Sequence, residues 1–284
     1  MNYILEVNNL RKEFKNFTLN DISFKLEPGY IMGFIGPNGA GKSTTIKLIM
    51  NLINKSGGEI KVFGLDHIEH EKEIKDRIGF VYDESHYYEN LTIKQMKSIV
   101  SGFYSKWDDN IFNRYMREFN LNPKSKIKTL SKGMKTKFSL AVALSHNADL
   151  IIMDEPTSGL DPIFRREILD ILHNIIQDEH KSIFFSTHIT TDLEKVADYI
   201  TFINNGKMVF SRPKDEILDN YAMVKGGTDL LNSDTRNQFI GLRETSVGFE
   251  GLTDNIDNIK KIFKDEVLIE RATLEDIMFY IVRR

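Results

Sequence analysis

The chain has 284 residues, of which 41% are hydrophobic and 28% charged, and this composition is typical of a globular protein with a sizeable core. The formal net charge of −3 excludes a bulk electrostatic attraction to nucleic acid or to an acidic membrane. The absence of cysteine excludes disulfides and cysteine-ligated metals, and fits a reducing compartment. No apolar run approaches the roughly 18 residues of a membrane span, and the first residues lack a signal-peptide pattern. We therefore expect another chain to supply any membrane-spanning part.

The first elements are β-strands. Residues 3–14 and 17–27 predict an antiparallel pair, and a continuous apolar run follows at residues 30–36. Similar runs occur at 149–155 and 181–188. Continuous runs of this length indicate parallel strands that are buried on both faces. A helical pattern follows each run, over residues 42–53, 162–177 and 191–197. Strands alternating with helices predict an α/β fold with a mostly parallel sheet.

A glycine-rich loop leaves the first buried strand. The stretch "GPNGAGKST" at residues 36–44 fits the phosphate-loop pattern G-x-x-x-x-G-K-[ST] through Gly36, Gly41, Lys42 and Ser43. Glycines let the backbone wrap a polyphosphate, with N–H groups from Gly39 to Thr44 pointing inward and the positive end of the next helix behind them. Lys42 is expected to reach the β and γ oxygens and Ser43 to complete a Mg²⁺ shell. The strand, loop and helix predict a phosphate-loop NTPase core.

A helical segment separates this core from the second buried strand. Between about residues 85 and 145 no buried-strand pattern appears, which predicts an inserted helical subdomain. Within it, "TLSKGMKTK" at 129–137 begins a helix with a serine, a glycine and three lysines. Taken alone, Ser131 in "LSKGM" has two interpretations, an ordinary helix cap or part of a ligand site.

Polar side chains end the second and third buried strands. Asp154 can hold Mg²⁺, and Glu155 can polarise the water that attacks a γ-phosphate. Asp161 and Pro162 form a typical helix start. His188 ends the third strand, and it can donate a hydrogen bond to the γ-phosphate because α/β sheets bind ligands where their strands end. A mixed tail follows residue 211, with strand-like residues 239–251 and a final helix over 273–284.

The ordered set "GPNGAGKST", "LSKGM", "LIIMDEPTSGLD" and "STH" resembles the ATPase subunit of an ABC transporter over residues 3–212. The resemblance implies ATP as substrate with Mg²⁺ as cofactor, and two head-to-tail ATPase subunits of identical or different sequence. Each subunit's signature, usually LSGGQ, closes over its partner's ATP. It implies nucleotide contacts at Gly36, Asn38, Gly39, Ala40, Gly41, Lys42, Ser43 and Thr44, contacts in trans from Ser131, Lys132, Gly133 and Asp161, catalytic roles for Lys42, Glu155 and His188, and metal contacts at Ser43, Asp83 and Asp154.

The resemblance also implies a domain organisation and a setting. We expect an ATPase domain at 1–215, including the helical subdomain, and a small α+β accessory or regulatory extension at 216–284. The protein would lie peripherally on the cytoplasmic face of the membrane, bound to a separate permease and to no nucleic acid, and would energise export of a drug, an antibiotic or an amphipathic peptide. An alternative is a soluble ABC-type ATPase acting on ribosomes or DNA. A non-hydrolysing regulatory subunit is a second alternative, although Glu155 and His188 are both present.

Three positions depart from the family pattern. Asp83, in "IGFVYDES", stands where the family has glutamine; a carboxylate can still bind Mg²⁺ there, or it is a loop residue. Lys132 replaces the third signature residue, glycine, and either adds charge near the partner's nucleotide or faces solvent. Met134 replaces the glutamine.

Aromatic residues offer two further interpretations. Phe14 matches the family's adenine-stacking aromatic, Phe17 is a second candidate, and both could be core residues. The cluster "SHYYEN" at 85–90 lies where the resemblance implies a groove for the permease. Tyr87 and Tyr88 therefore contact the permease or pack between the subdomains.

Overall fold

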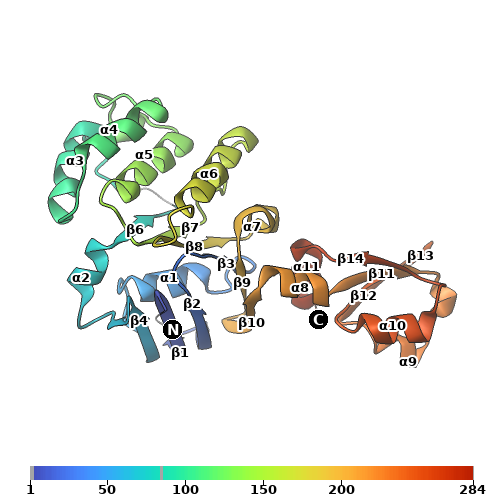
Figure 1. Cartoon of the computed structure of the whole chain (residues 1–284). Coiled ribbons are helices and arrows are strands. Elements are labelled where there is room, and N and C mark those ends of the chain that lie inside the picture. The colour runs from blue at the N-terminus through green and yellow to red at the C-terminus, as the bar shows by residue number, and fades with distance from the viewer. Residues whose placement is uncertain (1–2, 84–85, 284) are drawn as a thin grey trace. The chain divides into compact units, whose positions relative to one another are not determined.

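The computed structural model describes residues 3–83 and 86–283, and these form two compact units. The first unit contains the chain up to Ile189 together with Tyr199–Ser211. The second contains Thr190–Asp198 together with the chain from Arg212 onward. Figure 1 shows the helices and strands of both units. Within the described ranges, no helix is both long enough and apolar enough to cross a membrane.

A large sheet forms the centre of the first unit. Within the described residues it has ten strands in the order β5-β4-β1-β2-β10-β9-β3-β8-β7-β6. The strand bounds are β1 (Leu5–Glu13), β2 (Thr18–Leu26), β3 (Ile31–Ile35), β4 (Gly57–Val62), β5 (Leu65–Asp66), β6 (Ile78–Val81), β7 (Leu150–Asp154), β8 (Ser182–Thr187), β9 (Tyr199–Asn204) and β10 (Lys207–Pro213).

The three predicted buried strands lie next to one another in this sheet. β3, β8 and β7 are parallel neighbours, and every residue in them is buried, as their continuous apolar runs predict. The register places Ile35 beside Thr187 and Asp154 beside Ser186, so the residues that follow the three strands emerge at one edge. β6 joins β7 in parallel and was not predicted as a strand, because a four-residue apolar run is too short to identify.

The N-terminal strands form the predicted antiparallel part. β1 pairs antiparallel with both β2 and β4, and β4 pairs antiparallel with β5. Phe24, Phe34 and Phe184 lie in a buried aromatic cluster, with ring centroids 5.3–5.6 Å apart. Burial of one such side chain contributes about 1.5–3 kcal/mol. This cluster therefore gives the strands that carry the site a rigid support.

The segment between β6 and β7 is helical, as predicted, although residues 84 and 85 of the expected range lie outside the described residues. Figure 1 shows α3, α4 and α5 grouped together. Polar caps begin these helices: Thr92 forms a capping box with Gln95 at α3, Asp108 caps α4 and Ser131 caps α5. The helices of the first unit are α1 (Lys42–Ile49), α2 (Glu71–Asp76), α3 (Ile93–Val100), α4 (Asp109–Glu118), α5 (Lys132–Leu144) and α6 (Pro162–Ile175), with short 3₁₀ turns at Ser101–Phe103 and Ile127–Thr129.

The second unit contains an antiparallel sheet in the order β12-β13-β11-β14, with helices around its own core of Val224, Phe249, Ile259 and Phe263. The helix after β8 belongs to this unit, because the backbone N–H of Leu274 donates to the Glu194 carboxylate at 2.7 Å. Its elements are α7 (Thr190–Val196), α8 (Lys214–Asn220), β11 (Ala222–Gly226), a 3₁₀ turn at Thr228–Leu230, α9 (Ser233–Arg236), β12 (Gly241–Thr245), β13 (Gly248–Thr253), α10 (Ile256–Phe263), β14 (Leu268–Arg271) and α11 (Leu274–Val282).

Candidate functional site

The predicted phosphate loop connects β3 to α1, and its glycines are structurally required. A β-carbon at Gly36 would lie 2.3 Å from the Ile203 carbonyl oxygen. Gly41 has a φ of +112°, and a β-carbon there would lie 2.8 Å from Leu19 Cδ1. Lys42 Nζ folds back onto the loop and donates to the Gly36 carbonyl at 2.8 Å. The loop is thus a tight turn that directs an ammonium group across its own backbone.

The start of α1 is suited to an anion. Gly41 provides no capping side chain, and the first turn of α1 contains no acidic residue. The first N–H groups of a helix have no partner within the helix and carry the positive end of its dipole. A phosphate group would satisfy both properties, as it does at other helix starts after glycine-rich loops.

Two acidic residues lie where β7 ends. Ser186 of β8 donates to Asp154 Oδ1 at 2.6 Å, and its hydroxyl accepts a bond from the Glu155 backbone N–H at 3.1 Å. Glu155 adopts a left-handed backbone with φ of +49°, a conformation that costs of order 1–3 kcal/mol and is concentrated at functional sites. Burial raises the pKa of Asp154, and hydrogen bonds from Ser186 and Ser43 oppose that effect.

Glu155 joins Lys42 and His188. Its Oε1 lies 3.2 Å from Lys42 Nζ, and its Oε2 lies 2.7 Å from His188 Nδ1. The side chains of Lys42 and Glu155 are 6% and 11% exposed, so water screens this ion pair little. A carboxylate only accepts hydrogen bonds, so Nδ1 of His188 carries the proton that it donates to Glu155. His188 Nε2 could then donate to a phosphate only in the imidazolium form.

A polar cavity of about 380 Å³ brings most of the predicted site together. Its lining comes from the loop between β1 and β2, the phosphate loop, the loop after β6 and the segments that follow β7 and β8. It consists of Phe17, Asn38, Gly39, Gly41, Lys42, Ser43, Thr44, Asp83, Glu155, Ser158 and His188. Gly36, Ala40 and Asp154 are buried behind this lining. Ser158 also lines the cavity and was not predicted from the sequence. Its position, three residues after Glu155, could have indicated it.

The aromatic at the cavity is Phe17. Phe14, the first candidate from the sequence, is 46% exposed and is not among the lining residues, and its ring centroid lies 6.3 Å from that of Phe17. A base stacking on Phe14 therefore stays a prediction, whereas Phe17 already faces the cavity.

The four residues predicted to act in trans lie outside this lining. Ser131 and Asp161 cap α5 and α6, accepting bonds from Met134 N–H and from Ile163 and Phe164 N–H. A β-carbon at Gly133 would lie 3.1 Å from Phe164 Cδ1, so the two helices approach closely there. Lys132 was expected to lie near a partner's nucleotide or to face solvent; its side chain is 46% exposed, and its Nζ lies 2.9 Å from Asp83 Oδ1 of the same chain.

The donors around Asp154 fit a magnesium ion. Asp154 is buried, receives a hydrogen bond from Ser43, and has Glu155 and Asp83 as further negative neighbours that raise its pKa. Such a set of carboxylate and hydroxyl oxygens suits Mg²⁺. Across 3–83 and 86–283, no three acidic or histidine residues form a self-contained metal cage.

A second, largely apolar cavity of about 360 Å³ lies between β6, α3 and α5. Its lining includes Tyr82, His86, Tyr87, Met96 and Tyr104. Tyr87 packs against Phe138 with a centroid distance of 4.8 Å, and burial raises its pKa to about 12, whereas Tyr88 is 67% exposed. Tyr87 therefore packs inside the unit, and Tyr88 projects from it; Ser85 lies outside the described residues.

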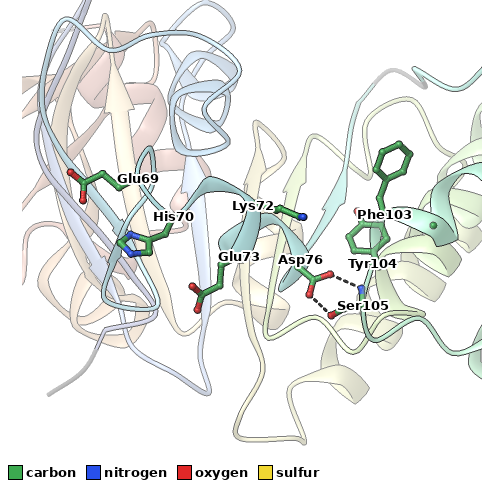
Figure 2. A pocket seen from close by; sticks show the side chains of 9 residues that line it. Glu69, His70, Lys72, Glu73, Asp76, Phe103, Tyr104 and Ser105 are labelled. Carbon is green, nitrogen blue, oxygen red and sulfur yellow. Dashed lines mark hydrogen bonds between the residues drawn. The ribbon is translucent and has the colours of Figure 1, made fainter.

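A third cavity, of about 590 Å³, shares Tyr104 with the second. Figure 2 shows α2 on one side, with Glu73 and Asp76, and Phe103, Tyr104 and Ser105 on the other. The Ser105 backbone N–H donates to Asp76 Oδ1 at 2.7 Å and closes one end. Aromatic side chains on one side thus face a helix of mixed charge, with Lys72 beside Glu73 and Asp76.

Comparison with known proteins identifies the family. Residues 19–158 match the family profile described as ABC transporter. The chain is 32% identical over 220 residues to the bacitracin transport ATP-binding protein BcrA of Bacillus licheniformis, covering 76% of this chain and 72% of that protein. It is 32% identical over 215 residues to the lantibiotic transport ATP-binding protein SrtF of Streptococcus pyogenes, covering 75% and 92%. A solved structure of an ATP-binding subunit of an ABC transporter superposes with a TM-score of 0.69 at 29% identity, covering 76% of this chain and 92% of that one.

The fold and the site define a phosphate-loop ATPase, with the loop, two acidic residues and a histidine at one edge of a mostly parallel sheet. With the similarities above, the chain belongs to the ABC transporter family, as a subunit that binds and hydrolyses ATP. The comparisons confirm the family that the sequence resembles, and the structure confirms the predicted α/β fold class.

Proposed function

We propose that this subunit energises the export of a drug, an antibiotic or an amphipathic peptide through a separate membrane-spanning subunit. For ATP hydrolysis, the main supporting observation is that Glu155 contacts both Lys42 and His188 inside the polar cavity. The relatives named for bacitracin and lantibiotic transport support the cargo class. The same names favour transport over the alternative of a soluble ATPase acting on ribosomes or DNA.

The residues of the cavity divide into three roles in this proposal. The backbone from Gly36 to Thr44 and Lys42 bind the phosphates of ATP, while Phe17, or Phe14 after a small movement, stacks on the base. Ser43, Asp154 and Asp83 would hold Mg²⁺, which would offset negative charge on the phosphates. Glu155 orients the attacking water as a general base, and His188 orients Glu155 and contacts the γ-phosphate.

ATP binding also brings two subunits together in this proposal. Ser131, Gly133 and Asp161 lie at the starts of α5 and α6, and these N-terminal ends favour negative charge. They would complete a partner's nucleotide site, with Lys132 beside them. A dimer with ATP sandwiched between two subunits would separate after hydrolysis, and this cycle would drive the permease between two states.

The permease would bind the first unit beside the helical segment. The aromatic lining of the second cavity and the exposed side chains of Tyr88 and Phe103 support a contact with an apolar segment of another protein. The protein would then lie peripherally on the cytoplasmic face of the membrane. Residues 1–215 form the ATPase domain in this proposal, and 216–284 form an accessory extension.

Purification from native membranes tests the proposed function. A tagged chain should retain a multi-spanning protein at about a one-to-one or two-to-one ratio when the membrane is solubilised in mild detergent. The same material should hydrolyse ATP faster in the presence of the transported compound. Recovery of ribosomal subunits or DNA in place of a membrane protein would reject export and support the soluble alternative.

A further inference from the structure

Two of the three residues that depart from the family pattern contact each other. Asp83 follows β6, and Lys132 is the first residue of α5, 49 residues further along the chain. Their carboxylate oxygen and ammonium nitrogen lie 2.9 Å apart. The family has glutamine and glycine at these positions, so neither residue has its present charge in the common pattern. Both departures therefore introduce a charge, and the two opposite charges form an ion pair within one chain.

The position of Lys132 at the start of α5 explains why it pairs with an acidic residue. A cation at the start of a helix is disfavoured by the positive end of the helix dipole. Asp83 neutralises that cation. The side chains are 46% and 41% exposed, and such pairs contribute only about 0–1 kcal/mol to stability. The pair is therefore too weak to be explained as a device for holding the fold together, and it can open at little cost.

Lys132 also lies near the loop that leads to α6. Gly159 has a φ of +69°, and a β-carbon there would lie 3.7 Å from Lys132 Nζ and 3.8 Å from its Cδ. Asp83 and Ser158, the residue before Gly159, both line the ATP cavity. Lys132 lies outside that lining, yet it pairs with Asp83 of one loop that provides it and lies near a second.

The geometry points to Lys132 as a positioning residue that occupies the Asp83 carboxylate and so competes with a divalent cation for it. This inference rests on the proposed ATP site and names a regulation of that site. Asp83 serves the metal fully only when Lys132 releases it. Release also frees the ammonium group at the signature. The concentration of Mg²⁺ that the protein needs is thus set by a lysine that does not touch the metal.

A Mg²⁺ titration of nucleotide binding tests this inference without turnover. The parent is the Glu155→Gln variant, and the probe is a fluorescent ATP analogue. Lys132→Met keeps the length of the side chain and removes its charge, so the Mg²⁺ midpoint for analogue binding should fall about two- to fivefold. Asp83→Asn should raise the midpoint. In the Asp83→Asn background, Lys132→Met should have no further effect, because its partner is already neutral.

Lys135→Met is the matched control, since Lys135 lies one turn along the same helix with Nζ 3.8 Å from Glu89. It should leave the midpoint unchanged. An equal fall with Lys135→Met, or a fall with Lys132→Met that persists in the Asp83→Asn background, would reduce Lys132 to a general charge effect and overturn the inference. So would an unshifted midpoint in Lys132→Met. If the parent binds no analogue at any Mg²⁺ concentration, the proposed ATP site itself is wrong.

Discussion

At the scale of single residues, Glu155 combines a strained backbone conformation with a side chain that contacts both Lys42 and His188. Its left-handed backbone follows directly from a buried strand, and each of its carboxylate oxygens has its own contact. Strained backbone conformations of this kind are concentrated at functional sites, and the two contacts fix the direction in which the carboxylate points. The Lys42 ammonium is also the group that would bind phosphate oxygens. Glu155 and the γ-phosphate therefore compete for one cation.

The first prediction concerns Glu155→Gln. The amide keeps the shape of the side chain but cannot act as a base, so the rate of ATP hydrolysis should fall by about 10²–10⁴-fold. Affinity for ATP should be unchanged or slightly higher, because Lys42 loses a competing carboxylate. Single-turnover hydrolysis and equilibrium binding of ATP measure the two effects separately.

Glu89→Gln provides the control, since Glu89 is exposed and lies outside the cavity. It should hydrolyse ATP at the wild-type rate. If Glu155→Gln retained full turnover, another group would have to activate the water, and Glu155 would be only the structural partner of Lys42.

At the scale of elements, the site depends on where neighbouring strands end. β3, β7 and β8 could be predicted because each is a continuous apolar run next to a recognisable motif, and parallel strands place their carboxyl ends together. The contact between Asp83 and Lys132 could not, because a loop and a helix start 49 residues apart have no shared pattern. α7 groups with the second unit, where the Glu194 carboxylate accepts a hydrogen bond from the backbone N–H of Leu274, 80 residues further along the chain.

A buried histidine connects two of these elements. His146 lies just after α5, with Nε2 3.0 Å from the Ile78 carbonyl oxygen of β6 and Nδ1 3.2 Å from that of Val142. Its ring stacks on Tyr104 with a centroid distance of 3.7 Å. Burial lowers the pKa of His146, opposed by the two carbonyl contacts and by Asp76, while Lys181 lowers it slightly. The helical segment and the sheet thus meet at a group that resists protonation.

The second prediction follows from this pKa. A histidine whose pKa is lower in the folded than in the unfolded state binds fewer protons when folded, so its contribution to stability is full above about pH 6.5 and declines below it. The free energy of unfolding should therefore fall between pH 7.5 and 5.5. His146→Phe keeps the stacking, loses both carbonyl contacts, and should be less stable at pH 7.5 by about 1–3 kcal/mol but less dependent on pH. Denaturant unfolding at several pH values measures both.

His180→Gln is the control for this experiment, because His180 is exposed. It should keep the wild-type dependence on pH. An equally steep dependence in His146→Phe would assign the effect elsewhere, and His67 would be the next candidate because burial also lowers its pKa.

At the scale of the whole molecule, Ser131 of the signature-like stretch lies outside the lining of its own chain's nucleotide cavity. Ser131 caps α5, and it is not among the residues that line the cavity with Lys42. If Ser131 contributes to ATP hydrolysis, we expect it to do so on a second molecule. A chain with a defective phosphate loop and a chain with a defective signature should then form one intact site when they pair.

The third prediction uses this separation. Lys42→Ala removes the phosphate-binding charge and Ser131→Arg blocks the signature, so either homodimer should have two inactive sites. In a mixed dimer, one site combines both defects and the other combines two intact halves. Random pairing makes about half of the dimers mixed, so about a quarter of all sites should regain activity. ATP hydrolysis by the mixed, purified variants measures this recovery.

Two controls decide how the recovery is interpreted. Loss of the Ser131 cap costs about 1 kcal/mol, so Ser131→Arg must first be shown to unfold near the wild-type temperature and to bind ATP. The subunits must also be shown to form homodimers, because an obligate pair with a different ATPase would give no recovery. With both conditions met, activity in the mixture would require Ser131 to act on a partner's ATP, since each chain contributes only the half that the other lacks. A mixture as inactive as its components would instead place Ser131 and Lys42 at the same nucleotide, through a closure of one chain upon itself.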